Sequence, residues 1–463
     1  MTCSDTSRVV IPPMDTHNQA LVKNVHPSDW VNPEPAPLYD LIVIGAGAAG
    51  LCTSAIAKGI GAKVALIEEH LFGGDCLNTG CVPSKSILRA ARAITGIGRA
   101  NRYGIHLEDE DIKIDFAAVM KHMRKLRAYI SNHDSVHRFR DMGVDIFLGH
   151  GEFANNKSVR VGDKTLHFKR AVIATGARAT KPSIVGLDKA HFYTNETIFS
   201  LTKCPDHLAV LGGGPIGCEL SQAFRQFGSK ITIIERGLQL LPREDPESST
   251  LLAQTFDHEG IKVKFNTQLN QVTVGDRKQL SLEKNGNLEI LEVDEILVSV
   301  GRTPNVSGLN LKAAGVKYDN KGIHVNDFLQ TSSPRIYAAG DVCMEWKFTH
   351  AADAAARIVI QNALFLRRKR LSSLVMPWCT YTDPEIAHVG MYENEARKKG
   401  IKVDTFVKNL NEVDRGIIDG EKGFVKLLLK KGSDKIIGAT IVGTHAGEMI
   451  GEVVLAIVAG VGL

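Results

Sequence analysis

The stretch YDLIVIGAGAAGLCTSAIAKGIGAKVALIEE, residues 39–69, decides the fold of this 463-residue chain. An apolar run leads to Gly45, glycines recur at positions 47 and 50, and a second apolar run ends at Glu68. This spacing predicts a strand, a tight turn, a helix and a parallel strand. Gly45 would permit the turn, Gly47 would let the backbone approach a pyrophosphate, and Gly50 would allow close helix–strand packing. The helix N-terminus would attract the phosphates, and Glu68 would accept a hydrogen bond from a ribose.

The same pattern returns at residues 207–235, HLAVLGGGPIGCELSQAFRQFGSKITIIE. Each motif residue stands 167 residues after its counterpart in the first copy. The closing acid is Glu235, and the glycines are Gly212, Gly214 and Gly217. Two ordinary glycine turns before helices are the alternative, but a repeated motif closed each time by an acid is far more specific than a single one. The sequence therefore predicts two dinucleotide sites, and two such cofactors in one enzyme usually exchange electrons.

The composition indicates a folded protein without an obvious macromolecular partner. Hydrophobic residues make up 44% of the chain and charged residues 23%, with a net charge of +5. These values are typical of globular proteins, and the length suggests about two to four domains. The run RRKR at 367–370 is expected to be a solvated loop or helix end. With no signal-peptide pattern and no apolar run of about 18 residues, we expect a cytoplasmic protein with neither a nucleic-acid nor a membrane partner.

Two of the eight cysteines, Cys76 and Cys81, lie in the segment GGDCLNTGCVPSK, residues 73–85. The segment follows the first motif closely, so both thiols are expected to lie near the first dinucleotide. Pro83 fits the first turn of a helix, which places Cys81 at a helix start, where the dipole and Lys85 would favour a thiolate. No C-x-x-C pair occurs, so a structural zinc site is not expected. A working disulfide, two buried free cysteines and a static disulfide all remain open on these residues alone.

Five further motifs follow along the chain. They are AVIATGARA (171–179), VGRTPN (300–305), IYAAGDV (336–342), FTHAADAAAR (348–357) and YTDPEIAHVG (381–390). Together with the cysteine segment and the glycine motifs, they resemble the class I pyridine nucleotide–disulfide oxidoreductases. The resemblance runs from about residue 38 to the end, and it is closest to the mercuric-reductase-like and dihydrolipoamide-dehydrogenase-like branches of that family.

The resemblance implies an α/β fold with two Rossmann-like dinucleotide-binding domains and a C-terminal α+β dimerisation domain. The implied parts are an N-terminal extension (1–37), a FAD-binding domain in two pieces (38–185 and 306–372), an NAD(P)-binding domain (186–305) and the dimerisation domain (373–463). A homodimer is implied when the chain is complete. Neither the His-Pro…Glu segment of thiol-reducing members nor the terminal cysteine pair of mercuric reductases follows, so we expect an incomplete dimerisation domain. The proline-rich extension is expected to be an extended segment packed on the body, or an ordered tail.

The resemblance also implies an electron route. Hydride would pass from NAD(P)H to FAD, and the reduced flavin would open a Cys76–Cys81 disulfide through Cys81, the sulfur nearer the flavin. Cys76, expected to be the more accessible, would exchange with a small disulfide substrate, or both sulfurs would bind a soft metal-ion substrate; no other metal is expected. Lys85 would pair with Glu219 beside this centre. The residues implied to bind FAD or NAD(P)H are Gly45, Gly47, Gly50, Glu68, Gly73, Gly74, Lys85, Gly151, Ala174, Thr175, Gly176, Gly212, Gly214, Gly217, Glu235, Gly301, Arg302, Gly340, Asp341 (at the ribitol), His350 and Ala351.

Two residues depart from or qualify the family pattern. Asp75 stands where members commonly have threonine, and an acid there would raise the thiol pKa unless it is solvated or paired. Glu235 would repel a 2′-phosphate and favours NADH, although the adjacent Arg236 leaves NADPH open. The leading hypothesis is a mercuric-reductase-like disulfide or metal-ion reductase. Dihydrolipoamide dehydrogenase is the alternative within the family, and a truncated, non-catalytic flavoprotein scaffold is the alternative of another class.

Overall fold

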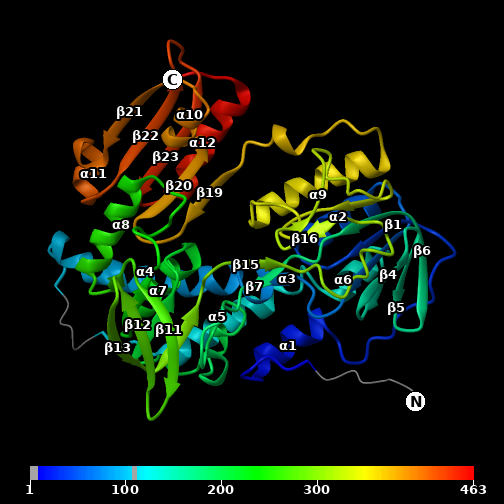
Figure 1. Cartoon of the computed structure of the whole chain (residues 1–463), viewed down its shortest axis with the longest axis horizontal. Helices are drawn as coiled ribbons and strands as arrows, with labels where there is room; N and C mark the ends of the chain where they lie inside the picture. The colour runs from blue at the N-terminus through cyan, green and yellow to red at the C-terminus, as the bar shows by residue number, and fades with distance from the viewer. Residues whose placement is uncertain (1–8, 107–111) are drawn as a thin grey trace.

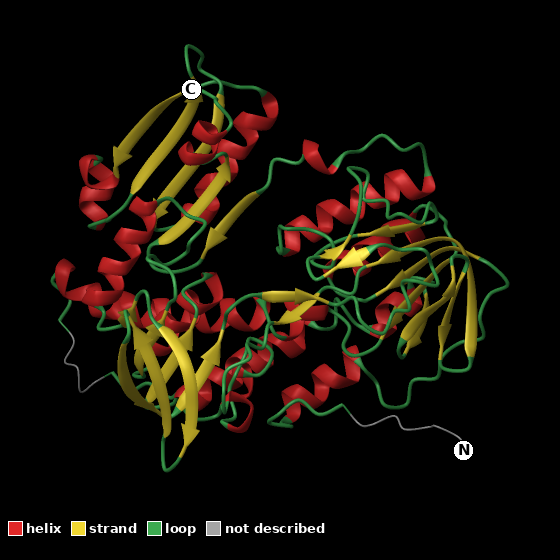
Figure 2. Ribbon diagram, in the orientation of Figure 1, coloured by secondary structure: helices red, strands yellow, loops and turns green. Residues whose placement is uncertain are grey.

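The computed structural model describes residues 9–106 and 112–463, and it contains three folded parts (Figure 1). The first, on the right of Figures 1 and 2, is a mixed sheet covered by helices. The second, at the lower left, combines a parallel and an antiparallel sheet, and the third, at the upper left, is an antiparallel sheet with helices. The predicted α/β fold with two nucleotide-type units and a C-terminal α+β part is confirmed. The predicted boundaries near residues 185, 305 and 372 stay predictions.

The first glycine motif lies at the centre of a seven-stranded sheet. The strand order is β3-β2-β1-β6-β5-β4, and β18 also pairs with β6. The pairs among β1, β2, β3, β6 and β18 are parallel, whereas β4 and β5 extend β6 in antiparallel fashion. The parallel strands are almost wholly buried, as expected for a sheet covered on both faces. The strands are β1 (Tyr39–Ile44), β2 (Val64–Glu68), β3 (Asp145–Leu148), β4 (Gly151–Asn155), β5 (Ser158–Val161), β6 (Lys164–Ile173) and β18 (Ile336–Ala338).

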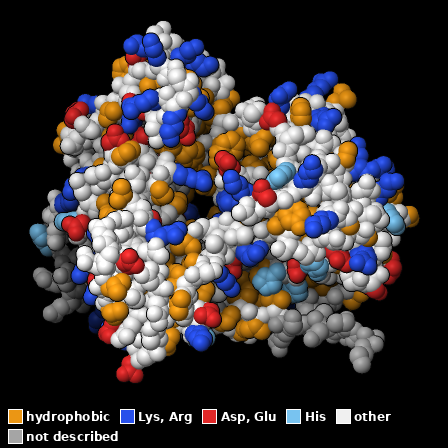
Figure 3. All heavy atoms as spheres, in the orientation of Figure 1, with side chains coloured by type: hydrophobic (Ala, Val, Ile, Leu, Met, Phe, Trp, Pro, Cys, Tyr) orange, Lys and Arg blue, Asp and Glu red, His pale blue; other side chains and the backbone are white. Residues whose placement is uncertain are grey.

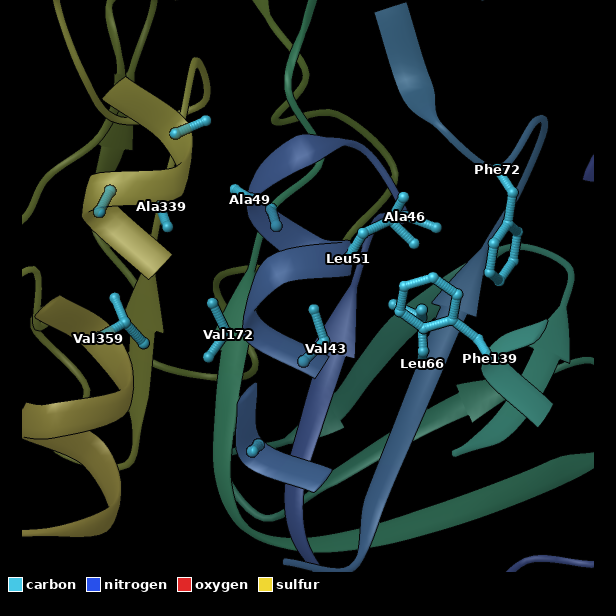
Figure 4. Packing of buried hydrophobic residues seen from close by; sticks show 14 of the residues in the cluster. Val43, Ala46, Ala49, Leu51, Leu66, Phe72, Phe139, Val172, Ala339 and Val359 are labelled. Carbon is cyan, nitrogen blue, oxygen red and sulfur yellow. The ribbon is translucent and has the colours of Figure 1, made fainter. Parts of the chain in front are cut away.

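Small side chains let two helices approach this sheet closely. Helix α2 (Ala48–Gly59) follows β1, and helix α9 (Thr349–Leu364) packs against α2. Figure 4 shows Val43 and Val172 of the strands beside Ala49 of α2, and all three are buried. Because α2 is rich in alanine and glycine, its backbone lies near the strands, and the helix N-terminus follows directly from the glycine turn.

The second glycine motif forms a smaller copy of this arrangement. The strand order β10-β9-β8-β14 is parallel throughout, and an antiparallel sheet β11-β12-β13 follows it. The parallel strands are β8 (His207–Leu211), β9 (Lys230–Ile234), β10 (Lys262–Lys264) and β14 (Glu295–Val298). The antiparallel strands are β11 (Gln268–Val274), β12 (Lys278–Lys284) and β13 (Asn287–Val293). The helices are α7 (Pro215–Gln226), which starts at the glycine turn, and α8 (Pro246–His258).

Several short elements join the two units. The strands β7 (Ala177–Ala179) and β15 (Arg302–Pro304) pair antiparallel, so the segments after the first and second units lie side by side near the middle of Figure 1. Helix α4 (Cys81–Arg99) packs against both α5 (Phe116–Ile130) and α7, which ties the cysteine segment to the second unit. The remaining elements here are α3 (Gly74–Asn78), α6 (Val136–Asp141), β16 (Tyr318–Asp319) and β17 (Gly322–Ile323).

The C-terminal part is a five-stranded antiparallel sheet in the order β19-β20-β23-β22-β21. Its strands are β19 (Pro377–Thr380), β20 (Glu385–Gly390), β21 (Val403–Asn409), β22 (Phe424–Lys430) and β23 (Ile436–Gly443). Its helices are α10 (Glu393–Lys398), α11 (Asp414–Asp419) and α12 (Ala446–Ala459), the last packed on β20 and β23. Among the described residues, none of the helices has both the length and the apolar character needed to cross a bilayer.

The structure describes the N-terminal extension from residue 9 onward, and the first eight residues lie outside the described part of the chain. It packs on the body as expected, but it is not simply extended, because Thr16–Val25 form helix α1. Asp15 caps this helix by accepting hydrogen bonds from the backbone N–H groups of His17 and Asn18. Leu21 and Val25, one helical turn apart, are fully buried in the core of the first part. The sequence prediction missed the helix because only this short apolar spacing marks it between prolines.

Candidate active site

The first turn can be built only from glycine at two of its positions. Gly45 has a φ of +103°, and a Cβ added there would lie 2.4 Å from the carbonyl oxygen of Ala174. A Cβ on Gly50 would lie 1.8 Å from the Gly45 oxygen, so this glycine provides the predicted close packing of helix against strand. Gly47 faces Gly74 of the cysteine segment, where an added Cβ would meet the Gly47 Cα at 2.6 Å. The turn and the cysteine segment therefore lie backbone to backbone.

The second turn repeats this geometry. Gly212 has a φ of +98°, and its added Cβ would lie 2.8 Å from the oxygen of Ser299. An added Cβ on Gly217 would lie 2.1 Å from the Gly212 oxygen, whereas one on Gly214 would meet no protein atom within 4 Å. No protein atom therefore requires glycine at position 214, and Gly214 lines the space that a nucleotide would occupy, as the motif predicts.

The two closing acids bind their own loops. Glu68 accepts hydrogen bonds from the backbone N–H groups of Ala46, at 2.6 Å, and His70, at 2.8 Å. Glu235 accepts equivalent bonds from Gly213 and Gly237, both at 2.6 Å. Burial raises the pKa of the Glu68 carboxyl. Each carboxylate oxygen can still accept a hydrogen bond from a ribose hydroxyl. Each acid can therefore hold its own loop and bind a ribose at the same time.

One continuous cleft of about 3000 Å³ joins both turns to the cysteines. Sites for drug-sized ligands measure roughly 300–1,000 Å³, so this cleft has room for two dinucleotides, and its glycine walls fit FAD at the first turn and NAD(P)H at the second. Figure 3 shows a hollow in the middle of the displayed face. The predicted cofactor residues that line the cleft are Gly45, Gly47, Glu68, Gly74, Lys85, Gly151, Ala174, Thr175, Gly176, Gly212, Gly214, Glu235, Gly301, Arg302, Gly340, Asp341 and His350. Those that do not line it are Gly50, Gly73, Gly217 and the fully buried Ala351.

Motifs distant in sequence meet along this cleft. Thr175 donates its hydroxyl to the carbonyl of Asn305 at 2.7 Å, and the Asn305 amide donates back to the Thr175 carbonyl at 2.9 Å. Gly340, with a φ of +79°, lies against Ala49 of α2. The segments AVIATGARA, VGRTPN and IYAAGDV therefore form one wall around the first turn, which the sequence alone could only suggest by family order.

The two thiols lie at consecutive helices on this wall. Cys76 belongs to α3, and Cys81 is the first residue of α4, as predicted. Both are free thiols within hydrogen-bonding reach of each other. The Thr349 hydroxyl, at the start of α9, lies 3.3 Å from the Cys81 sulfur, and the sequence prediction did not single out this contact. Cys81 is exposed and Cys76 is half-buried, and both line the cleft. The expected greater accessibility of Cys76 to a substrate stays a prediction.

The surroundings divide the pair into a thiolate and a thiol. Hydrogen bonds from Cys76 and Thr349, together with the positive charge of Lys85, lower the pKa of Cys81 to about 6. The hydrogen bond to Cys81 and burial raise the pKa of Cys76. At neutral pH, Cys81 is therefore the ionised sulfur, in keeping with its place at a helix start.

Lys85 and Glu219 link this centre to the second unit. The Lys85 ammonium lies 2.9 Å from Glu219, which is buried on α7, and it also lies 4.5 Å from the ring centroid of Tyr381. The second Glu219 oxygen accepts a hydrogen bond from the Tyr381 backbone at 2.9 Å. The ammonium group of Lys85, on α4, is therefore held in place by Glu219 of α7 and by Tyr381 of the C-terminal part.

Asp75, the residue that departs from the family pattern, is paired. Its carboxylate forms an ion pair with Arg302, and Arg302 also lies 3.3 Å from Asp341 and donates to the carbonyl of Ala177 at 2.8 Å. The Thr79 hydroxyl donates to Asp75 at 3.3 Å. The ion pair with Arg302 offsets the negative charge of Asp75 beside the thiols. The ion pair joins the cysteine segment to VGRTPN and IYAAGDV.

Replacing Lys85 with methionine is expected to raise the pKa of Cys81. The change removes a neighbouring cation and leaves the buried Glu219 unpaired, and both effects disfavour the thiolate. A rise of about one unit would slow alkylation of Cys81 about tenfold at pH 5.5, with the difference vanishing above about pH 8. Iodoacetamide labelling across pH, read by peptide mass spectrometry, measures it. Arg89→Met, one turn along α4 on the exposed face, is the matched control; identical profiles for Lys85→Met and wild type would contradict the assignment.

No cluster of three or more histidine, cysteine, aspartate or glutamate residues suited to a metal occurs in the described ranges.

The sequence is similar to known proteins over most of its length. Residues 39–356 match the family model described as pyridine nucleotide-disulphide oxidoreductase, and residues 376–463 match the model of its dimerisation domain.

Individual relatives cover nearly the whole chain. A mercuric reductase from Bacillus cereus is 36% identical over 423 residues, which are 90% of this chain and 67% of the relative. A dihydrolipoyl dehydrogenase from Chlamydia muridarum is 31% identical over 428 residues, 90% of either chain. The solved Cu(II) complex of the HOCl-induced flavoprotein disulfide reductase RclA from Escherichia coli aligns with a TM-score of 0.82 and 27% identity, covering 92% of this chain and 94% of its own.

Proposed function

Because this chain belongs to the pyridine nucleotide-disulphide oxidoreductase family, we propose that it uses NAD(P)H and FAD to reduce a small disulfide or a soft metal ion through Cys76 and Cys81. The single observation that carries the proposal is the continuous cleft that joins both glycine turns to the thiol pair. A structural or static role for the cysteines would not require either nucleotide turn to open onto them. No observation favours the non-catalytic scaffold considered from the sequence.

The chain supplies binding and orientation for the cofactors. FAD, when bound, takes up a hydride from NAD(P)H and delivers its electron pair to a disulfide. The turn at Gly45–Gly50 and the N-terminus of α2 would hold the FAD pyrophosphate, and the turn at Gly212–Gly217 with α7 would hold that of NAD(P)H. Arg302 and Asp341 would lie along the first cofactor, and Glu68 and Glu235 would bind the two riboses.

The thiols carry the exchange. Two electrons and one proton convert the Cys76–Cys81 disulfide into a Cys76 thiol and a Cys81 thiolate at neutral pH. Cys81, with the lower pKa, would hold the negative charge. As the family resemblance implies, Cys76 would form the mixed disulfide with an incoming substrate. With a soft metal ion as the substrate, both sulfurs would serve as ligands.

A substrate panel tests the proposal. Hg²⁺, Cu²⁺, lipoamide and glutathione disulfide are each offered to the FAD-loaded protein with NADH. We expect NADH oxidation with one class. We favour a metal ion because the mercuric reductase from Bacillus cereus is 36% identical to this chain, whereas the dihydrolipoyl dehydrogenase from Chlamydia muridarum is 31% identical. Lipoamide turnover alone would establish the runner-up. NADH oxidation that is equal in a Cys76→Ser, Cys81→Ser double variant would contradict the proposal.

We expect NADH to be preferred over NADPH. The Glu235 carboxylate lines the cleft at the end of β9, where it would repel a 2′-phosphate. In Glu235→Gln, which removes the charge with little change in size, the ratio of kcat/KM for NADPH to that for NADH should rise about tenfold. Glu68→Gln, the same change in the first unit, should leave the ratio as in wild type. An unchanged ratio in Glu235→Gln would assign the discrimination to Arg236 or another residue.

The assembly is proposed to be a homodimer. The match of residues 376–463 to a dimerisation domain supports this state, and so do Leu455 and Val458 of α12, which are 67% and 66% exposed in the single chain. Large apolar side chains exposed together on one helix are typical of an interface. A stable monomer in sedimentation at micromolar concentration would contradict the proposal. The cytoplasmic location stays a prediction.

A further inference from the structure

The backbone between the two cysteines is held from inside the protein. The carbonyl of Asn78, the last residue of α3, accepts a hydrogen bond from Arg127 at 2.7 Å, and the next carbonyl, of Thr79, accepts one from Asn195 at 3.4 Å. A cation at the last carbonyl of a helix satisfies a group that the helix itself leaves unpaired. The side chain of Asn78 donates to Phe72 and Gly74 on the other side of the segment, at 2.8 and 2.9 Å.

Arg127 is a buried cation with neutral partners. The residue is only 3% exposed on α5, and its second amino group donates to the side-chain oxygen of Asn18 at 2.8 Å. The nearby carboxylate of Asp15 pairs instead with Arg124, at 2.7 Å. Burial, with a contribution from Arg124, lowers the pKa of Arg127 to about 10. Its position therefore depends on the two oxygens of Asn78 and Asn18, because a buried donor without a partner is strongly disfavoured.

Asn18 belongs to the N-terminal segment, and its orientation is fixed. Its amide nitrogen donates to the carbonyls of Ile11 and Pro13, at 3.1 and 2.8 Å, and the side chain is fully buried. Since both amide protons are used in this way, the amide oxygen must face Arg127. Residues that precede the nucleotide fold in the sequence thus complete a chain of contacts that ends between the two cysteines.

The same segment also holds the start of the cysteine loop. The carbonyl of Val25, at the end of α1, accepts a hydrogen bond from the backbone of Phe72 at 3.1 Å. Phe72 is fully buried and packs edge to face against Phe139, with ring centroids 6.2 Å apart (Figure 4). The residue after Phe72 is the first glycine of the loop, Gly73. Both the entry to the loop and the connection between its sulfurs are therefore tied to the N-terminal segment.

We propose that residues 9–25 form a brace for the redox loop, in which Asn18 and Arg127 are positioning residues that set the effective concentration of the Cys76 and Cys81 thiols toward each other. This inference rests on the proposed function of the pair. Forming the disulfide removes two electrons and one proton from the Cys76 thiol and the Cys81 thiolate. It also requires the two Cα atoms to lie within about 4.4–6.8 Å of each other. A loop held at Asn78 stays near that geometry when the bond opens, whereas a loosened loop would favour the open dithiol.

The test measures the thiol–disulfide equilibrium directly. Wild type, Asn18→Leu and Arg127→Met are equilibrated in buffers of dithiothreitol and its cyclic disulfide, which supply and accept the two electrons, while the buffer takes up or supplies the remaining proton. Reduced Cys76 and Cys81 are then counted by alkylation and mass spectrometry. We expect a three- to tenfold lower effective concentration in both variants, equal to a potential about 15–30 mV less negative. Arg127→Lys, which keeps the charge and one donor, should shift the equilibrium less.

Asn24→Ala is the matched control. Asn24 lies on the same helix and donates to Ser131 at 2.8 Å, at the end of α5, without reaching the cysteine loop. Asn24→Ala should leave the thiol–disulfide equilibrium as in wild type. A shift as large as that of Asn18→Leu and Arg127→Met would mean that the effect comes from general loosening of α1, and it would overturn the proposal. Wild-type effective concentrations of the two thiols in the Asn18 and Arg127 variants would also overturn the proposal. If Asn18→Leu does not fold, the effective concentration measured in Arg127→Lys decides. A wild-type protein that forms no Cys76–Cys81 disulfide in any buffer would instead contradict the proposed function, so the two failures are distinguishable.

Discussion

Replacing either Cys76 or Cys81 with serine is expected to lower turnover with the disulfide or metal substrate by at least about 10³-fold. A single sulfur cannot form the intramolecular disulfide, so no group next to the substrate can accept the electron pair from the flavin and pass it on. Electron transfer to ferricyanide, which accepts electrons without a thiol, should remain within about threefold of wild type. Parallel assays with the physiological class of acceptor and with ferricyanide measure both effects on one preparation.

The two single variants should differ in a second respect. Cys76→Ser replaces the thiol that donates to Cys81 with a hydroxyl donor and retains Thr349 and Lys85, so Cys81 should still be ionised near neutral pH and alkylate readily. Cys81→Ser retains only Cys76, whose pKa is raised by burial, so its alkylation at pH 7 should be slow. Cys204→Ser, at a half-buried thiol elsewhere in the chain, is the control and should change neither assay. Full turnover in either active-site variant, or the opposite order of alkylation, would refute the assigned roles.

Gly217→Ala is expected to lower the NADH-dependent rate about 100-fold while leaving FAD content unchanged. The added Cβ would lie 2.1 Å from the Gly212 oxygen, so α7 must move away from β8 and carry its N-terminus out of place at the cleft. A displacement of about 1 Å at a binding group can cost about 10²-fold in rate. The first turn is unaffected, so dithionite should still reduce the bound flavin. Anaerobic reduction by each reductant, followed by absorbance, separates the two effects.

Two further alanine variants calibrate this result. Gly59→Ala, on α2, has no neighbour within 4 Å of the added Cβ and should behave as wild type. Gly214→Ala is equally free of protein contacts, so it should fold normally and weaken only the binding of NADH, through a higher KM. Equal effects of Gly214→Ala and Gly217→Ala on thermal unfolding would show that the two glycines do not have the distinct roles assigned to them.

Local requirements of the backbone were visible in the sequence. A positive φ at Gly45 and at Gly212, and a helix that touches its own turn at Gly50 and at Gly217, can be met only by glycine, so their spacing predicted both nucleotide units. The start of a helix at Cys81 was equally local, because Pro83 belongs in a first helical turn. Such features depend on a few consecutive residues and survive in any tertiary setting.

Contacts between distant segments were decided only by the tertiary structure. Arg302 neutralises Asp75 across 227 residues of sequence, Thr349 meets Cys81 across 268, and Arg127 joins Asn18 across 109. Helix α1 was missed because only the short apolar spacing of Leu21 and Val25 marks it in the sequence, and burial of these two side chains in the first core stabilises it. Fold and cofactor turns were therefore determined by local backbone chemistry, and the helix start and Lys85 already predicted a Cys81 thiolate. The contact of Thr349 with Cys81, the pairing of Asp75 and the bracing of the loop depend on charges and donors that only folding brings together.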